Sequence, residues 1–156
     1  MSAFRMILAA LALSALPAHA HDGIHVEDAY ARTTPRSAAV FMTITNHGGT
    51  EDRLLSARTE AAGMAGLHTH RETADGVMTM PDVPEGFAIP GHETRILARG
   101  GDHVMLMGLT RPLKPGDTIR LILTFQREGE VSLDVPVDND RKPADDAATT
   151  THSHTP

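Results

Sequence analysis

The feature that most constrains the fold is a series of short segments in which apolar and polar residues alternate, separated by glycine and proline. In Asp117–Phe125 the apolar side chains recur at every second position, and Pro115-Gly116 forms a turn before the segment. Such alternation places one face of a strand against a core and the other in water. No segment keeps the 3.6-residue period of a helix, so an all-β sandwich or barrel is expected. The predicted strands are Ala38–Asn46, Glu93–Ala98, Asp102–Leu109, Asp117–Phe125 and Val131–Val137, with weaker ones at His25–Ala31, Arg53–Thr59, Met64–Arg71 and Val77–Met80.

The first twenty residues have the organisation of a signal peptide. Arg5 precedes an apolar run from Met6 to Leu16, and Ala18-His19-Ala20 has the pattern of a signal-peptidase cleavage site. The run is too short to span a bilayer. We therefore expect export to the bacterial periplasm, cleavage after Ala20, and no stable membrane insertion.

The mature chain has the size of one domain, which we place at residues 21–137. Residues 138–156 contain no large apolar side chain and are predicted to be a disordered tail. Removal of Arg5 takes the 14 basic residues to 13, against 20 acidic ones, a balance that argues against nucleic-acid binding. The absence of cysteine excludes disulfides and the thiolate of a blue-copper electron-transfer site.

Histidine and methionine alternate at His103 and Met105, and in a strand these side chains point to the same face. Thioethers are soft ligands that suit Cu(I) and not Mg²⁺ or Ca²⁺, so the pair indicates a copper site. A lone strand methionine is more often a core residue, which is our interpretation of Met42. His47 and His92 lie in glycine-containing turns and receive no role. The same two-residue spacing recurs in His68-Thr69-His70 and Met78-Thr79-Met80.

Longer motifs give the chain a family resemblance. They include Ala38–Ile44, Gly76–Met80 and Gly100–Leu109, within a region from about Ile24 to Val137. On these motifs the chain resembles the PCu(A)C family of periplasmic copper chaperones. The resemblance implies a cupredoxin-like Greek-key β-sandwich.

The copper motif of that family is a histidine, a methionine twelve positions later, and a His-x-Met about twenty-one residues further on. The resemblance implies a Cu(I) site made of two imidazoles and two thioethers. The ligands that it implies in this chain are His68, Met80, His103 and Met105.

The chain departs from the motif at two points. Thr69 stands where the family often has a second methionine, and 22 residues separate Met80 from His103. We place the extra residue in a loop around Pro84–Gly91, where lengthening is cheap. His70 remains an alternative to His68 as the first ligand. Met78 and Met107 are interpreted as packing neighbours, although Met78 should face the same side as Met80 and remains an alternative ligand.

Neutral imidazoles and thioethers stabilise Cu(I) relative to Cu(II). The resemblance implies a copper chaperone that delivers Cu(I) during assembly of a respiratory oxidase. We expect a monomer and no catalysis at the site. The implied acceptor is the apo copper site of subunit II of cytochrome c oxidase, with a thiol reductase copper chaperone as a second partner. A copper or zinc buffer that stores metal and delivers none is the alternative.

Further histidines lie near both ends of the mature chain, and imidazoles without thioethers suit Cu(II) or Zn²⁺. One interpretation is that His152 and His154 capture Cu(II), and the other is a featureless tail. His21, a secondary metal candidate, would also supply the amine and imidazole of an oxygenase copper brace. A plain adhesion module with incidental His103 and Met105 is the remaining alternative.

Overall fold

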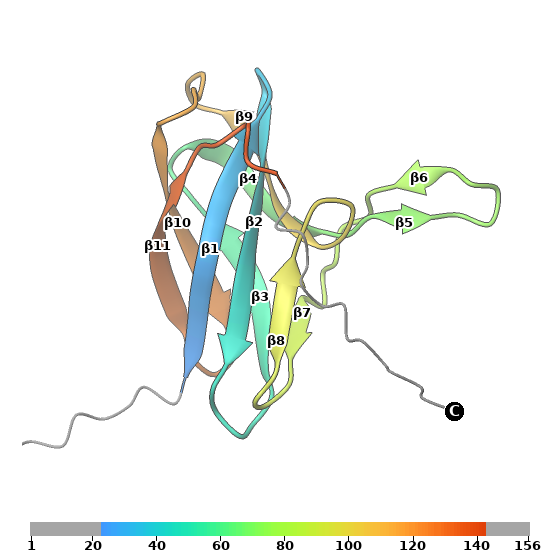
Figure 1. Cartoon of the computed structure of the whole chain (residues 1–156), viewed down its shortest axis with the longest axis vertical. Coiled ribbons are helices and arrows are strands. Elements are labelled where there is room, and N and C mark those ends of the chain that lie inside the picture. The colour runs from blue at the N-terminus through green and yellow to red at the C-terminus, as the bar shows by residue number, and fades with distance from the viewer. Residues whose placement is uncertain (1–22, 143–156) are drawn as a thin grey trace, which may run out of the picture.

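The alternating segments form eleven strands within residues 23–142, the part of the chain that the computed structural model describes. Two antiparallel sheets pack face to face as a Greek-key sandwich, and a separate two-stranded arm projects from one side (Figure 1). Residues 23–142 contain no helix. This part of the chain therefore has no helix that is long and apolar enough to cross a membrane.

The first sheet is built around β2, which has neighbours along both of its edges. Its strand order is β1-β2-β9-β4, and β8 also pairs with β2. One half of β2 pairs with β9 and the other half with β8, so β8 and β9 follow one another along the same edge. The strands are β1 (Ile24–Thr33), β2 (Ser37–Asn46), β4 (Ala62–His68), β8 (Thr94–Leu97) and β9 (His103–Leu109).

The second sheet has the order β11-β10-β3-β7, and the projecting arm pairs β5 with β6. The chain crosses repeatedly between the two sheets, for example from β3 to β4 and from β9 to β10. The strands are β3 (Asp52–Arg58), β7 (Phe87–Ile89), β10 (Thr118–Phe125) and β11 (Glu130–Pro136), with β5 (Arg71–Glu72) and β6 (Met78–Thr79) in the arm.

Aliphatic side chains fill the space between the sheets. Val40 of β2, Val104 and Leu106 of β9, and Leu121 of β10 are fully buried there. Met42 belongs to the same cluster, as predicted. Each buried side chain of this size contributes about 1.5–3 kcal/mol, so a chain with few aromatic residues can still form a stable sandwich.

The five stronger strand predictions are confirmed to within a few residues, but three details differ. Phe87–Ile89 pairs with β3 as strand β7, in a stretch where the sequence predicts a loop. Three residues are too few to show alternation, and the prolines on both sides are typical of a loop. β4 ends at His68 and β6 at Thr79, so His70 and Met80 lie outside the strands that the spacing predicted.

The third difference concerns residues 138–142, the first part of the tail that the composition predicts to be disordered. The Asp138 N–H donates to the carbonyl of Ala31, and Asn139 accepts a hydrogen bond from the Thr33 N–H. The Arg141 guanidinium lies 4.7 Å from the ring centre of Tyr30. Polar contacts therefore fix these residues along β1, and a composition without large apolar side chains does not reveal such contacts. Residues 143–156 lie outside the described range.

Candidate metal centre

The alternation of β9 separates a core face from an outer face. Val104 and Leu106 point into the sandwich, whereas His103, Met105 and Met107 occupy the outer face of the first sheet. His103 is nevertheless only 2% exposed, because neighbouring side chains cover it. Among these is Phe41 of β2, whose ring centre is 6.1 Å from that of His103.

The turn before β9 fixes the orientation of the His103 ring. Its Nδ1 lies 3.0 Å from the carbonyl oxygen of Gly101, which can only accept, so Nδ1 carries the proton. The Nε2 lone pair of the neutral ring is therefore free for a metal, as in histidine ligands held by a backbone carbonyl. Burial lowers the pKa of His103, the hydrogen bond to Gly101 opposes the shift, and His70 and His68 lower the pKa further. The ring is thus neutral at pH 7.

An ion pair anchors the same turn to the sheet. The Arg95 guanidinium donates to Oδ2 of Asp102 over distances of 2.6 and 3.1 Å, and also to the carbonyl of Ala88 at 3.0 Å. Asp102 directly precedes His103. The interaction therefore ties β8 to the start of β9 and limits the movement of the ring.

His68, the last residue of β4, is directly opposite His103 in the strand register. The two ring centres are 5.8 Å apart. Nε2 of His68 lies 2.8 Å from Oδ1 of Asp82, yet this buried nitrogen has no hydrogen bond. A Cβ atom on Gly66 would lie 3.1 Å from the same nitrogen, so the missing side chain of that glycine makes room for the ring.

His70 approaches His103 from the connection between β4 and β5. Its backbone N–H donates to the carbonyl of Gly101 at 3.3 Å, so one carbonyl holds both histidines. The ring centres of His70 and His103 are 5.2 Å apart. Nδ1 of His70 is buried and has no hydrogen-bond partner. A buried polar nitrogen without a partner costs about 1–3 kcal/mol, and a metal ion is one of the groups that supply the missing interaction.

An open cavity of about 510 Å³ brings most of the predicted site together. Three of the four predicted ligands, Met80, His103 and Met105, line it. The second histidine on the cavity wall is His70, whereas the prediction was His68. His68 adjoins the cavity through its contact with His103 but does not line it. Met80, which also lines the cavity, is 51% exposed. The lining residues are Ala39, Phe41, His70, Met80, Arg99, Gly100, His103 and Met105.

The spacing of the imidazoles is compatible with a shared ion. A metal–nitrogen bond of about 2.0–2.1 Å puts each ring centre roughly 3.2 Å from the metal. Two rings on one ion then have centres roughly 4.5–6.4 Å apart, for angles from about 90° to 180° at the metal. Both the 5.2 and the 5.8 Å separations fall in this range.

The donor set at the cavity is neutral and soft. The thioethers of Met80 and Met105 line the cavity together with the imidazoles of His70 and His103. Mixed imidazole and thioether donors favour Cu(I) over harder ions. The secondary candidates His21, His152 and His154 lie outside the described residues.

Comparison with known proteins agrees with the fold. The family described as "Putative lipoprotein LpqE-like" matches residues 24–137. A curated relative from Leifsonia xyli subsp. xyli (strain CTCB07), "Putative lipoprotein Lxx21020", is 34% identical over 122 residues, which cover 78% of this chain and 73% of the relative.

Two solved structures extend the comparison. The solution structure of CuI-DR1885 from Deinococcus radiodurans is 33% identical, with a TM-score of 0.62 over 83% of this chain and 84% of that protein. An apo PCuAC domain from PmoF1 is 25% identical, with a TM-score of 0.62 over 74% of this chain and 92% of that domain. The resemblance to PCu(A)C proteins is thereby confirmed, and the chain belongs to the LpqE-like family.

Proposed function

We propose that this protein binds one Cu(I) ion at the cavity and carries it to a copper acceptor outside the cytoplasm. The main supporting observation is that two thioethers and the His103 imidazole, from segments distant in sequence, line one cavity, and that the His68 ring centre lies 5.8 Å from that of His103. The copper-bound state of a 33% identical structural neighbour also supports it. The proposed ligands are His68, Met80, His103 and Met105.

His68 is preferred to His70 as the fourth ligand for two reasons. It belongs to a strand whose register places it directly opposite His103. Its Nε2 also lies 2.8 Å from Oδ1 of Asp82, so Nδ1 is the ring nitrogen that remains for the metal. His70 lines the same cavity and is the direct competitor.

X-ray absorption of the Cu(I)-loaded protein tests the ligand set, and two sulfur and two nitrogen neighbours are expected. The variants His68→Gln and His70→Gln distinguish the two histidines. His68→Gln should lose one nitrogen neighbour and weaken Cu(I) binding by more than about tenfold, whereas His70→Gln should keep both nitrogens. The opposite result would assign the site to His70. Retention of Cu(I) binding in a Met80→Leu, Met105→Leu double variant would reject the site.

Delivery is favoured over storage by the accessibility of one ligand and by the absence of thiolates. Met80 lines the cavity and is half-exposed, so an acceptor can reach it. Cysteine ligands bind Cu(I) more strongly than neutral thioethers, so transfer to a thiolate site is downhill. We propose the apo copper site of cytochrome c oxidase subunit II as the acceptor, kept reduced by a thiol reductase copper chaperone.

Mixing the Cu(I)-loaded protein with the reduced apo domain of subunit II tests delivery. Copper should move to the acceptor and produce its dinuclear-centre absorption after oxidation. Copper that stays on this protein would indicate a buffer instead. We propose no enzymatic activity, and the absence of O₂ consumption with Cu(II) and a reductant is the expected control result.

We further propose that the protein is exported and cleaved after Ala20. We also propose that His152 and His154 on the tail capture Cu(II). The docked Arg141 lies over Tyr30, and the Tyr30 ring centre is 5.3 Å from that of Phe41 on the cavity wall. The tail thus starts on the face that carries the cavity. Mass spectrometry of the exported protein locates the cleavage site. Truncation after Lys142 should remove Cu(II) equivalents, and unchanged Cu(II) stoichiometry would reject the tail site.

A further inference from the structure

A second pair of imidazoles lies on the outer face of the first sheet, away from the cavity. His25 of β1 and His47, just after β2, have ring centres 4.7 Å apart and an interplanar angle of 83°. Both side chains are exposed. His47 follows Phe41, which lines the cavity, by six residues. Six residues of strand span about 20 Å. The pair is therefore separate from the proposed Cu(I) site.

The backbone holds both residues in fixed positions. His25 is paired with Thr45 in the ladder between β1 and β2. The His47 N–H donates to the carbonyl of Gly23 at 3.1 Å. A preorganised pair of ligands binds a metal more tightly than the same residues on mobile loops.

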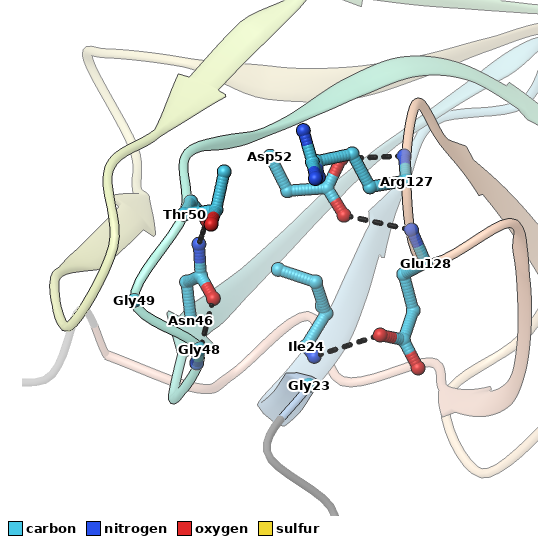
Figure 2. A pocket seen from close by; sticks show the side chains of 9 residues that line it. All are labelled: Gly23, Ile24, Asn46, Gly48, Gly49, Thr50, Asp52, Arg127 and Glu128. Atoms are coloured by element: carbon cyan, nitrogen blue, oxygen red, sulfur yellow. Dashed lines mark hydrogen bonds between the residues drawn. The ribbon is translucent and has the colours of Figure 1, made fainter.

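Asn46 stabilises the turn that carries His47, as Figure 2 shows. Its buried carboxamide accepts from the Gly48 N–H at 2.9 Å and donates to the carbonyl oxygens of Thr50 and Ile89 at 2.8 and 3.0 Å. Across from Asn46 in the same view, Oε2 of Glu128 accepts a hydrogen bond from the N–H of Ile24 at 3.3 Å. The start of β1 and the end of β2 are thus both anchored.

The separation of the two rings fits a particular geometry at a metal. With each ring centre roughly 3.2 Å from the ion, a 4.7 Å separation corresponds to an angle of roughly 95°. That angle is near the 90° of tetragonal Cu(II) sites and below the tetrahedral angle that Zn²⁺ prefers. Cu(II) also forms the strongest complexes of the first-row divalent ions with nitrogen ligands.

We propose that His25 and His47 form a Cu(II) site, distinct from the Cu(I) cavity. Within residues 23–142 no third imidazole, carboxylate or thiolate joins this pair to form a group of three, so water completes the coordination. Imidazoles without thioethers select the divalent ion, just as the mixed donors of the cavity select the monovalent one. The protein would then hold the two oxidation states of copper at two positions on one sheet.

Paramagnetic broadening of histidine ring signals in the NMR spectrum of the whole protein tests the site residue by residue. During titration with CuSO₄ at neutral pH, the His25 and His47 signals should broaden together. In His25→Gln the His47 signal should stay sharp over the same range of CuSO₄ concentration. The Cu(II) affinity derived from the broadening of the His47 signal should fall by more than about tenfold. Both positions are exposed, so glutamine should not disturb folding.

His92→Gln is the matched control, because His92 is exposed on the neighbouring turn and its N–H donates to the carbonyl of Gly48. This variant should leave the broadening of His25 and His47 unchanged. Two results would overturn the proposal. One is a His47 signal that broadens equally with and without His25, and the other is that neither signal broadens at two equivalents of Cu(II). Cu(I) affinity should be unaffected by His25→Gln, which keeps this test independent of the cavity.

Discussion

At the scale of single residues, a glycine controls the position of a proposed ligand. A Cβ atom on Gly66 would lie 3.1 Å from Nε2 of His68, closer than most such contacts. In Gly66→Ala the His68 ring should therefore shift by a few tenths of an ångström or rotate away. We expect Cu(I) affinity to fall by about tenfold, as when the support of a metal ligand is removed. Competition with a chromophoric Cu(I) chelator measures this change.

Gly63→Ala is the control for that variant, because it makes the same substitution on the same strand. A Cβ atom there would lie 3.7 Å from the carbonyl oxygen of Gly108, an ordinary contact. Both variants should leave the free energy of unfolding within about 1 kcal/mol of the parent. Equal Cu(I) affinities for the two variants would show that the His68 ring is not a ligand.

The buried imidazole of His103 makes the stability of the metal-free protein depend on pH. Its pKa is lowered by burial in the folded state, so the unfolded chain takes up a proton at higher pH. The contribution of His103 to the free energy of unfolding is complete above about pH 6.5 and is lost as the pH falls through the lowered pKa. Urea denaturation measures the free energy of unfolding at neutral and at mildly acidic pH. Between these two conditions, this free energy should fall more for the parent than for His103→Gln. An equal decrease in the free energy of unfolding in both proteins would show that His103 is not the cause of the pH dependence.

At the scale of elements, the arm of β5 and β6 is the part of the site with the least support. The arm projects from the sandwich (Figure 1). Two residue pairs form the ladder between its strands, and all four strand residues are exposed. An isolated two-stranded hairpin is marginally stable, so its amide hydrogens should exchange rapidly in the metal-free protein. Met80 directly follows β6, and a bond from its sulfur to Cu(I) would tie the arm to β9.

Cu(I) should therefore slow hydrogen exchange in residues 71–80, as measured by mass spectrometry. Met80→Leu should abolish this protection. Met78→Leu is the matched control, because Met78 is 59% exposed on the same arm and does not line the cavity. Protection that survives in Met80→Leu would mean that the arm does not take part in binding.

The same elements show what could be predicted from the sequence. The long alternating strands were predictable because burial on one face imposes a period of two, as in β9 and β10. The three-residue strand β7 was missed because it is too short to show a period. The pair His103 and Met105 was predictable from local spacing alone. The approach of His70 and Met80 depends on turns beyond the ends of β4 and β6, which carry no periodic signal.

At the scale of the whole molecule, the proposed ligands join the segment that follows the arm to β4 and β9, which already pair with each other in the first sheet. His68 ends β4, Met80 follows the arm, and Met105 belongs to β9. A ligand that binds only the folded state stabilises it by about 4 kcal/mol when its free concentration is a thousand times Kd. For a domain of this size that corresponds to a rise in Tm of roughly 10 °C or more.

Thermal unfolding with buffered Cu(I) under anaerobic conditions measures this linkage. The parent protein should show the full rise in Tm, and Met105→Leu should show little of it. Met107→Leu is the control, because Met107 has the same half-buried setting two residues further along β9 and pairs with Met64 rather than facing the cavity. If Met107→Leu lost the rise as completely as Met105→Leu, the stabilisation would come from copper bound along the outer face of β9, and the cavity would not be the site.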